Sequence, residues 1–171
     1  MDIIDNIRKR AADLNGAVVL PEATDERVLR AAQFLKKQQI CYIYLLGKDD
    51  ELNELADRHG IDLHNIEIVN PATSSRTSDF SERLYQRRKH KGMSREEAES
   101  TIQDPLYFGA AMVAAGKVDG AVAGSMATTG DVLRSALHLI GLRDGSDVVS
   151  SIFLMAMPDG SVFTYGDCGV V

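Results

Sequence analysis

The sequence has no tryptophan and only two cysteines, and aromatic residues make up 6% of the chain. Cys41 and Cys168 stand far apart, with no Cys-x-x-Cys spacing and no histidine cluster beside them, so the sequence offers no recognisable zinc site. Two isolated cysteines fit a reducing compartment, and we therefore expect a cytoplasmic protein.

Long apolar runs and an excess of positive charge are missing as well. No segment approaches the roughly 20 apolar residues of a membrane span. Residues 1–16 are amphipathic and charged rather than a basic stretch followed by an apolar run, which excludes a typical secretory signal. The formal net charge of -6 argues against nucleic acid as the main partner. We expect neither a membrane nor a nucleic-acid partner.

The composition that remains is that of an ordinary globular protein. Of the 171 residues, 44% are hydrophobic and 26% are charged. A chain of this length buries roughly 70% of the surface that its unfolded form exposes. One sizeable core can therefore form without a disulfide or a metal ion.

The first 70 residues alternate between helical and strand patterns. Apolar residues at spacings of three and four predict helices, and short apolar runs that end at Pro or Gly predict strands. Thr24 is the expected N-cap of the second helix. Alternation of this kind favours right-handed βαβ units and a mostly parallel sheet flanked by helices, an α/β fold. The predicted ranges are helices 3–14, 24–35 and 51–59 and strands 17–20, 41–46 and 66–69.

The second part of the chain begins with several helices. Ser94 with Glu97 forms a capping-box pattern, and Asp104 followed by Pro105 predicts a further helix start. A strand is expected at 121–123 and a helix at 131–140. Strands at 148–157 and 161–165 are predicted to form a hairpin through Pro158-Asp159-Gly160.

A loop rich in Gly, Ser and Thr connects the strand at 121–123 to the next helix. Such a loop can aim backbone N–H groups and hydroxyls at an anion, and the helix dipole adds a favourable potential. The alternative is an ordinary connection in which Thr128 or Thr129 caps the helix. The loop matches neither a Walker A motif nor a dinucleotide fingerprint. The candidate phosphate ligands are Gly124, Ser125, Thr128, Thr129 and, one turn into the helix, Arg134.

A basic run occupies residues 87–91, at the predicted end of a helix. Cations there complement the helix dipole, which is the simplest explanation of the run. Alternatively, one or two of these side chains face a cleft and bind phosphate, since a guanidinium fork suits a pair of oxygens.

Four segments, in this order, resemble those of the phosphate acetyltransferases. The first resembles the stretch after that family's first strand, the second its basic motif, the third its loop and helix, and the last its next strand. Two departures occur, because Gly130 stands where members vary and Ser135 replaces the usual proline after Arg134. The segments are residues 20–32, 88–92, 117–134 and 163–169.

The resemblance implies a three-layer, isocitrate dehydrogenase-like α/β enzyme that acts as a homodimer. It implies the conversion of acetyl-CoA and phosphate to acetyl phosphate and CoA, with CoA as a substrate and neither a metal nor a bound cofactor. Phosphate would attack the acyl carbonyl directly in a ternary complex, with arginines binding phosphate and a carboxylate acting as base toward the CoA thiol. Arg88 and Arg134 match family arginines implicated in substrate binding, and Ser125, Thr128 and Thr129 fall in the matching loop.

Family chains are roughly double this length, so the resemblance implies an N-terminal half, truncated before the second half. We expect a first domain over residues 1–145 and the start of a second over 146–171. The family's Ser-Arg pair and catalytic Asp would lie beyond residue 171, and the isolated piece would be nearly inactive. Two alternatives stay open, namely a phosphate butyryltransferase and a non-catalytic acetyl-CoA-sensing domain like the one appended to some malic enzymes.

Overall fold

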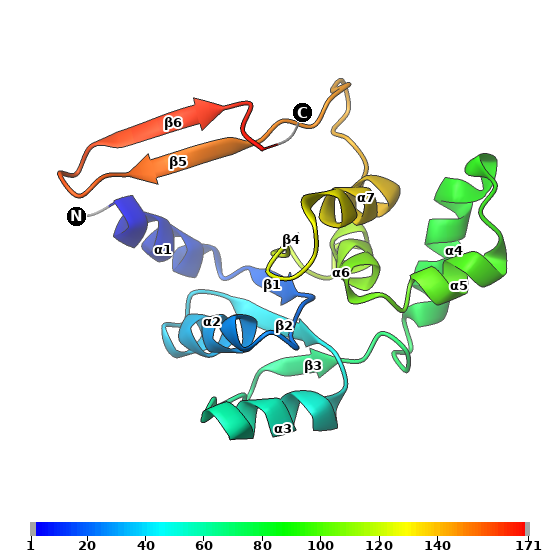
Figure 1. Cartoon of the computed structure of the whole chain (residues 1–171), viewed down its shortest axis with the longest axis horizontal. Helices are drawn as coiled ribbons and strands as arrows, with labels where there is room; N and C mark the ends of the chain where they lie inside the picture. Colours follow the sequence, from blue (N-terminus) through cyan, green and yellow to red (C-terminus); the bar gives the residue numbers. More distant parts are fainter. Residues whose placement is uncertain (1–2, 170–171) are drawn as a thin grey trace.

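The computed structural model describes residues 3–169, and its centre is a four-stranded parallel sheet in the order β3-β2-β1-β4 (Figure 1). The helices are α1 (Ile3–Leu14), α2 (Glu26–Lys37), α3 (Asp49–His59), α4 (Thr77–Arg88), η1 (Lys89–Lys91), α5 (Arg95–Thr101), α6 (Pro105–Ala114) and α7 (Thr129–Leu139). The strands are β1 (Ala17–Leu20), β2 (Tyr42–Leu46), β3 (Glu67–Val69), β4 (Gly120–Ala121), β5 (Ile152–Ala156) and β6 (Val162–Gly166). The predicted α/β class and the parallel sheet flanked by helices are confirmed.

Two apolar cores lie on opposite faces of this sheet. Successive strand residues point to opposite faces, so Leu45 packs with α2 and α3 while Leu46 packs with α4 and α6. In the second core the rings of Phe80 and Phe108 meet edge to face, with centroids 5.1 Å apart. The sheet is therefore the middle of three layers. None of the helices within residues 3–169 is long and apolar enough to span a bilayer.

The starts of α5 and α6 follow the capping signals in the sequence, whereas the start of α2 does not. Ser94 and Glu97 form both bonds of a capping box, and Asp104 caps α6 with Pro105 in its first turn, as predicted. Helix α2 differs, because Asp25 is its N-cap and accepts from the Arg27 N–H, so the assignment of Thr24 is wrong. Asp and Thr are both good caps, and adjacent candidates cannot be separated by residue type alone.

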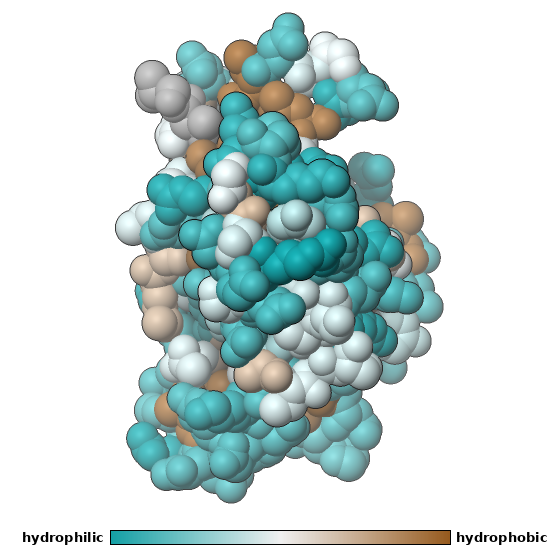
Figure 2. Space-filling view, turned by 90° about the vertical axis from the view of Figure 1, so that its right-hand side faces the viewer, coloured by the Kyte–Doolittle hydropathy of each residue, from teal (hydrophilic) through white to brown (hydrophobic). Residues whose placement is uncertain are grey.

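Strands β5 and β6 form a separate antiparallel hairpin, joined at the predicted 158–160 turn. Every residue of both strands is exposed, including Phe153 and Phe163 at 55% and 50%. Hydrophobic side chains accordingly gather at the end of the molecule where the hairpin lies (Figures 1 and 2). The domain boundary between 145 and 146 stays a prediction.

We expect Phe108→Ala to lower the free energy of unfolding of the four-stranded sheet and its helices by about 3–5 kcal/mol, because it removes a fully buried ring and leaves a cavity. Phe34→Ala is the control, since the Phe34 ring is 44% exposed and lies under the Arg8 guanidinium. Urea unfolding followed by circular dichroism measures both. Equal losses in the two variants would contradict the assignment of the core.

Candidate functional site

The loop that follows β4 closes around the carboxylate of Glu22. Strands β1 and β4 are parallel neighbours, so their carboxyl ends lie at one edge of the sheet, and Glu22 follows β1 by two residues. Each carboxylate oxygen accepts two backbone N–H groups of the loop, at 2.6–2.9 Å for three of the four bonds. The four donors are Gly124, Ser125, Met126 and Ala127.

Successive N–H groups that converge in this way form an anion-binding nest. Gly124 has φ +102°, a backbone conformation that L side chains rarely adopt, and it begins the turn. Burial on its own raises the pKa of Glu22, but the four backbone donors outweigh burial and hold that pKa below its ordinary value. Glu22 is therefore an anion at neutral pH, and it occupies the nest.

A second set of hydrogen bonds, made by Arg27, joins the segment after β1 to the loop after β4. The Arg27 guanidinium forks onto Asp25, with Nη2 to Oδ2 at 2.6 Å, and Nη2 also donates to the Ser125 carbonyl at 2.7 Å. The Arg27 side chain and its backbone N–H lower the pKa of Asp25 to about 2. Ser125 Oγ is buried without a hydrogen bond of good geometry among residues 3–169, although it lies close enough to Asp25 to help lower that pKa.

Thr128 is the N-cap of α7, as one of the two sequence alternatives predicted. Its hydroxyl oxygen accepts from the Asp131 N–H at 3.2 Å, and its O–H donates to Asp131 Oδ2 at 2.7 Å. Asp131 also accepts from Arg134 Nη1 at 2.7 Å. The hydrogen bonds from Thr128 and then Arg134 lower the pKa of Asp131. Thr129 is exposed in the first turn of α7.

Arg88 and Arg134 come together around His138, although they lie on different helices. Both guanidinium groups disfavour the positive charge on His138, after burial the next causes of its lowered pKa. Both also act on Tyr107, whose hydroxyl lies 3.3 Å from His138 Nδ1. Burial is the main reason that the pKa of Tyr107 is raised.

Arg88 differs from Arg134 in having no anionic partner among residues 3–169. Arg134 is exposed and paired with Asp131, whereas Arg88 is half-buried. Within the described part of the chain no carboxylate lies within ion-pairing distance of Arg88, and its side chain makes no hydrogen bond. With His138 it lines a pocket bounded by η1 and α5. An unpaired, half-buried guanidinium beside a neutral imidazole is a site suited to an anion.

The neighbouring Arg87 caps the C-terminal end of α7. Its Nε donates to the His138 carbonyl at 3.0 Å, and its Nη2 lies 3.5 Å from the Ile140 carbonyl, at the C-terminal end of α7. A Cβ on Gly141 would lie 2.7 Å from Nη2, so glycine leaves room for this arginine. The basic run therefore also serves a helix other than its own.

The structure thus groups some of the predicted site residues more closely than others. Arg88 and Arg134 share one environment, and Thr128 is linked to Arg134 through Asp131. Gly124 and Ser125 are bonded through their backbones to Glu22. Their contact with a substrate stays a prediction. Three further polar residues of this region, Glu22, Tyr107 and His138, carry no signal in the sequence that points to a site.

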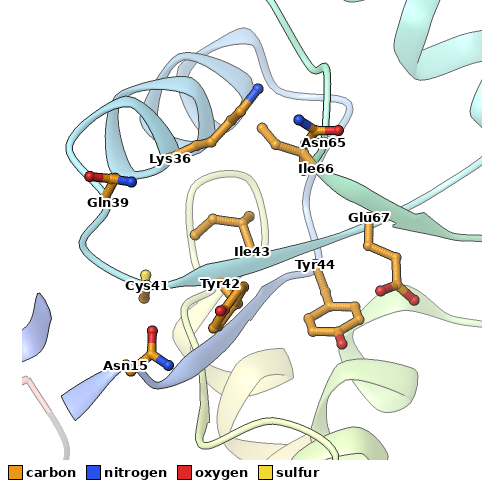
Figure 3. Close-up of a pocket in the computed structure, with 10 residues that line it drawn as sticks. All are labelled: Asn15, Lys36, Gln39, Cys41, Tyr42, Ile43, Tyr44, Asn65, Ile66 and Glu67. Atoms are coloured by element: carbon orange, nitrogen blue, oxygen red, sulfur yellow. The ribbon is translucent and has the colours of Figure 1, made fainter.

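A second pocket opens at the opposite edge of the sheet, where β1, β2 and β3 begin (Figure 3). Asn15, Cys41 and Asn65 line it from the segments that precede these strands, and the Tyr42 and Tyr44 rings extend from β2. Burial raises the pKa of the Cys41 thiol, so this cysteine is a poor nucleophile at neutral pH. The charged groups around His138 lie elsewhere in the molecule.

The fold and the polar region together define an open parallel α/β protein with charged side chains gathered near the carboxyl ends of its strands, where such sheets bind ligands. The chain belongs to the phosphate acetyl/butyryl transferase family, because the family model described as "Phosphate acetyl/butaryl transferase" matches residues 2–171. The resemblance seen in the sequence is therefore confirmed.

Individual relatives agree with the family match. The phosphate acetyltransferase of Acetivibrio thermocellus is 39% identical over 100% of this chain and 52% of its own length. That of Thermoanaerobacterium thermosaccharolyticum is 37% identical over 99% of this chain and 53% of its own length. The chain therefore spans about half the length of these curated relatives.

Two solved structures are similar to almost the whole of this chain. The EutD phosphotransacetylase from Staphylococcus aureus superposes with a TM-score of 0.88 at 34% identity, over 98% of this chain and 50% of its own. A phosphotransacetylase from Streptococcus pyogenes gives a TM-score of 0.90 at 31% identity, over 99% and 52%. The fold described above is that of the family.

We expect Arg88→Ala to raise the pKa of His138, because it removes a positive charge that disfavours the imidazolium. Arg83→Ala is the matched control, since Arg83 lies on the same helix but pairs with Asp79 on the exposed face. Titration of the His138 ring by NMR measures both. An unchanged midpoint in Arg88→Ala would contradict the proximity of these two groups.

Proposed function

We propose that this chain carries the phosphate-binding part of a phosphate acetyltransferase, which transfers an acetyl group between coenzyme A and inorganic phosphate. The observation that carries the proposal is the unpaired guanidinium of Arg88, half-buried beside His138 and Arg134. Membership of the family and the names of the relatives support the reaction.

In this proposal the phosphate lies between the two arginines. Arg88 offers a planar fork of donors that matches two phosphate oxygens, and Arg134 adds a second cation. The lowered pKa keeps His138 neutral at pH 7. When the Tyr107 hydroxyl donates to Nδ1, Nε2 carries the proton and can donate to a third oxygen. Thr128 and Thr129, exposed at the start of α7, and Ser125 with Gly124 in the loop would border the acyl group.

Acetyl transfer to phosphate depends on the positioning of the two substrates and on the stabilisation of negative charge. A phosphate oxygen attacks the carbonyl carbon of acetyl-CoA, a C–O bond forms and the C–S bond breaks. The electron pair leaves on sulfur, the attacking hydrogen phosphate gives up its proton as acetyl phosphate forms, and the thiolate takes up a proton so that CoA is released as the thiol. The arginines hold the attacking phosphate at the carbonyl and stabilise negative charge in the transition state, and these are two general sources of rate enhancement.

The proposal leaves the base that exchanges a proton with the CoA thiol unassigned within residues 3–169. It includes acetyl phosphate and CoA as the other ligands, a homodimer as the assembly, a cytoplasmic location and a boundary near residue 145 between two domains. The separate sheet formed by residues 152–166 supports that boundary. Acetyl is preferred over butyryl as the transferred group because the relatives above are phosphate acetyltransferases.

We expect inorganic phosphate to raise the pKa of His138 in the 171-residue chain, because a bound dianion favours the imidazolium. Arg88→Ala should raise the dissociation constant for phosphate by about tenfold or more, since hydrogen bonds to charged groups contribute about 1.5–3 kcal/mol. The His138 NMR signal, followed as phosphate is added, measures both effects.

Arg83→Ala again serves as the control and should bind phosphate like the parent chain. Sodium chloride at equal ionic strength separates specific binding from screening. Equal phosphate affinity in the parent chain and Arg88→Ala, or no response of His138 to phosphate, would overturn the proposed site.

We expect acetyl phosphate to compete with phosphate for this site. We also expect the isolated chain to release little CoA from acetyl-CoA and phosphate, because no residue within 3–169 is assigned as the base that exchanges a proton with the CoA thiol. Competition is measured through the His138 signal and CoA release by thiol titration. Butyryl phosphate is the comparison that reports acyl preference. CoA release at the rate of a complete enzyme would contradict the assignment of this chain to substrate binding alone.

A further inference from the structure

The nest in the loop after β4 is already occupied by a carboxylate of the same chain. Four consecutive N–H groups, from Gly124 to Ala127, donate to Glu22 and, among residues 3–169, to no other group. We propose that Glu22 is a positioning residue: its carboxylate is an internal anion that fixes this loop and, through the loop, the start of α7 and Arg134.

The loop is fixed through its backbone N–H groups and through a backbone carbonyl. Glu22 takes the N–H groups of the loop, while Arg27 donates to the Ser125 carbonyl from the other side at 2.7 Å. Glu22 comes from the short segment between β1 and α2, and Arg27 comes from the first turn of α2, where Asp25 holds its guanidinium in turn. The loop is therefore bonded at donors and acceptor alike by one segment about 100 residues earlier in the chain.

The loop leads through the N-cap of α7 to the arginine that we assign to phosphate. Ala127, the last donor to Glu22, precedes the N-cap Thr128. Thr128 and Arg134 both bond to Asp131, at 2.7 Å each. A shift of the loop would move the cap, and the cap is hydrogen-bonded to the Asp131 carboxylate that orients the Arg134 guanidinium.

An internal anion in the nest also decides where an external one can bind. With four donors used by Glu22, a substrate phosphate finds no free N–H there and is directed to the side chains around His138. This consequence rests on the proposed function, whereas the role of Glu22 in fixing the loop does not. The two can therefore fail separately.

The direct test is the removal and replacement of the carboxylate in the 171-residue chain. We expect Glu22→Ala to shift and broaden the NMR signals of the 124–127 amides and to speed their hydrogen exchange at least tenfold. Sodium formate should then restore them, because formate supplies a carboxylate that fits the vacated nest. Equal concentrations of sodium chloride should not. The same titration should leave these amides unchanged in the parent chain.

Two further variants separate positioning from a general loss of stability. Glu22→Gln keeps the side-chain length but turns an NH2 group toward two of the donors, so it should perturb the loop without responding to formate as strongly as Glu22→Ala. Glu26→Ala, which removes the nearby carboxylate that pairs with Arg30, should leave the loop amides in place. Unchanged 124–127 amides in Glu22→Ala, or a formate response equal to that of the parent chain, would overturn the proposal.

Phosphate binding gives the functional arm of the same experiment. We expect Glu22→Ala to bind phosphate at His138 about threefold to tenfold more weakly, up to about 1.4 kcal/mol, and formate to reverse the loss. If the parent chain binds no phosphate, the proposed function fails while the loop result still decides the role of Glu22. If phosphate affinity is unchanged although the loop is perturbed, Glu22 does not position Arg134.

Discussion

Parallel pairing of β1 with β4 is the constraint on which the rest of this structure depends. It places the carboxyl ends of two strands, separated by about 100 residues of chain, at the same edge of the sheet. Strand β1 is also bonded along its other side to β2, so its position is set twice. Everything that follows these two strands, the Glu22 segment and the Gly124 loop, inherits that placement.

The polar region built on this edge has two parts with different electrostatics. Around Glu22 every charge has a partner within the chain, and the anion is balanced by backbone dipoles and by Arg27. Around His138 the balance is left open, because Arg88 has no counter-ion within residues 3–169 and the imidazole stays neutral. The region around Glu22, in which the charges are paired, thus fixes the region around His138, in which Arg88 is unpaired. An unpaired cation of this kind is suited to bind an external anion.

Most of the fold could be predicted from local signals. The Asp104-Pro105 start, the Ser94 and Glu97 box and the 158–160 turn each involve residues a few positions apart, and each is confirmed. The arginine pair was found through the resemblance, and the structure brings both arginines to His138. Glu22 could not be found this way, because its partners lie 102 to 105 residues away and an acidic residue before a helix has an ordinary explanation.

The exposed hairpin of β5 and β6 has a consequence for cooperativity. Its ten residues are ordered at a cost of about 1–2 kcal/mol each in backbone entropy, yet none of them is buried. Two-stranded hairpins are at best marginally stable on their own. Opening of the hairpin and unfolding of the four-stranded sheet are therefore separate events with separate free energies, and a single melting temperature does not describe this chain.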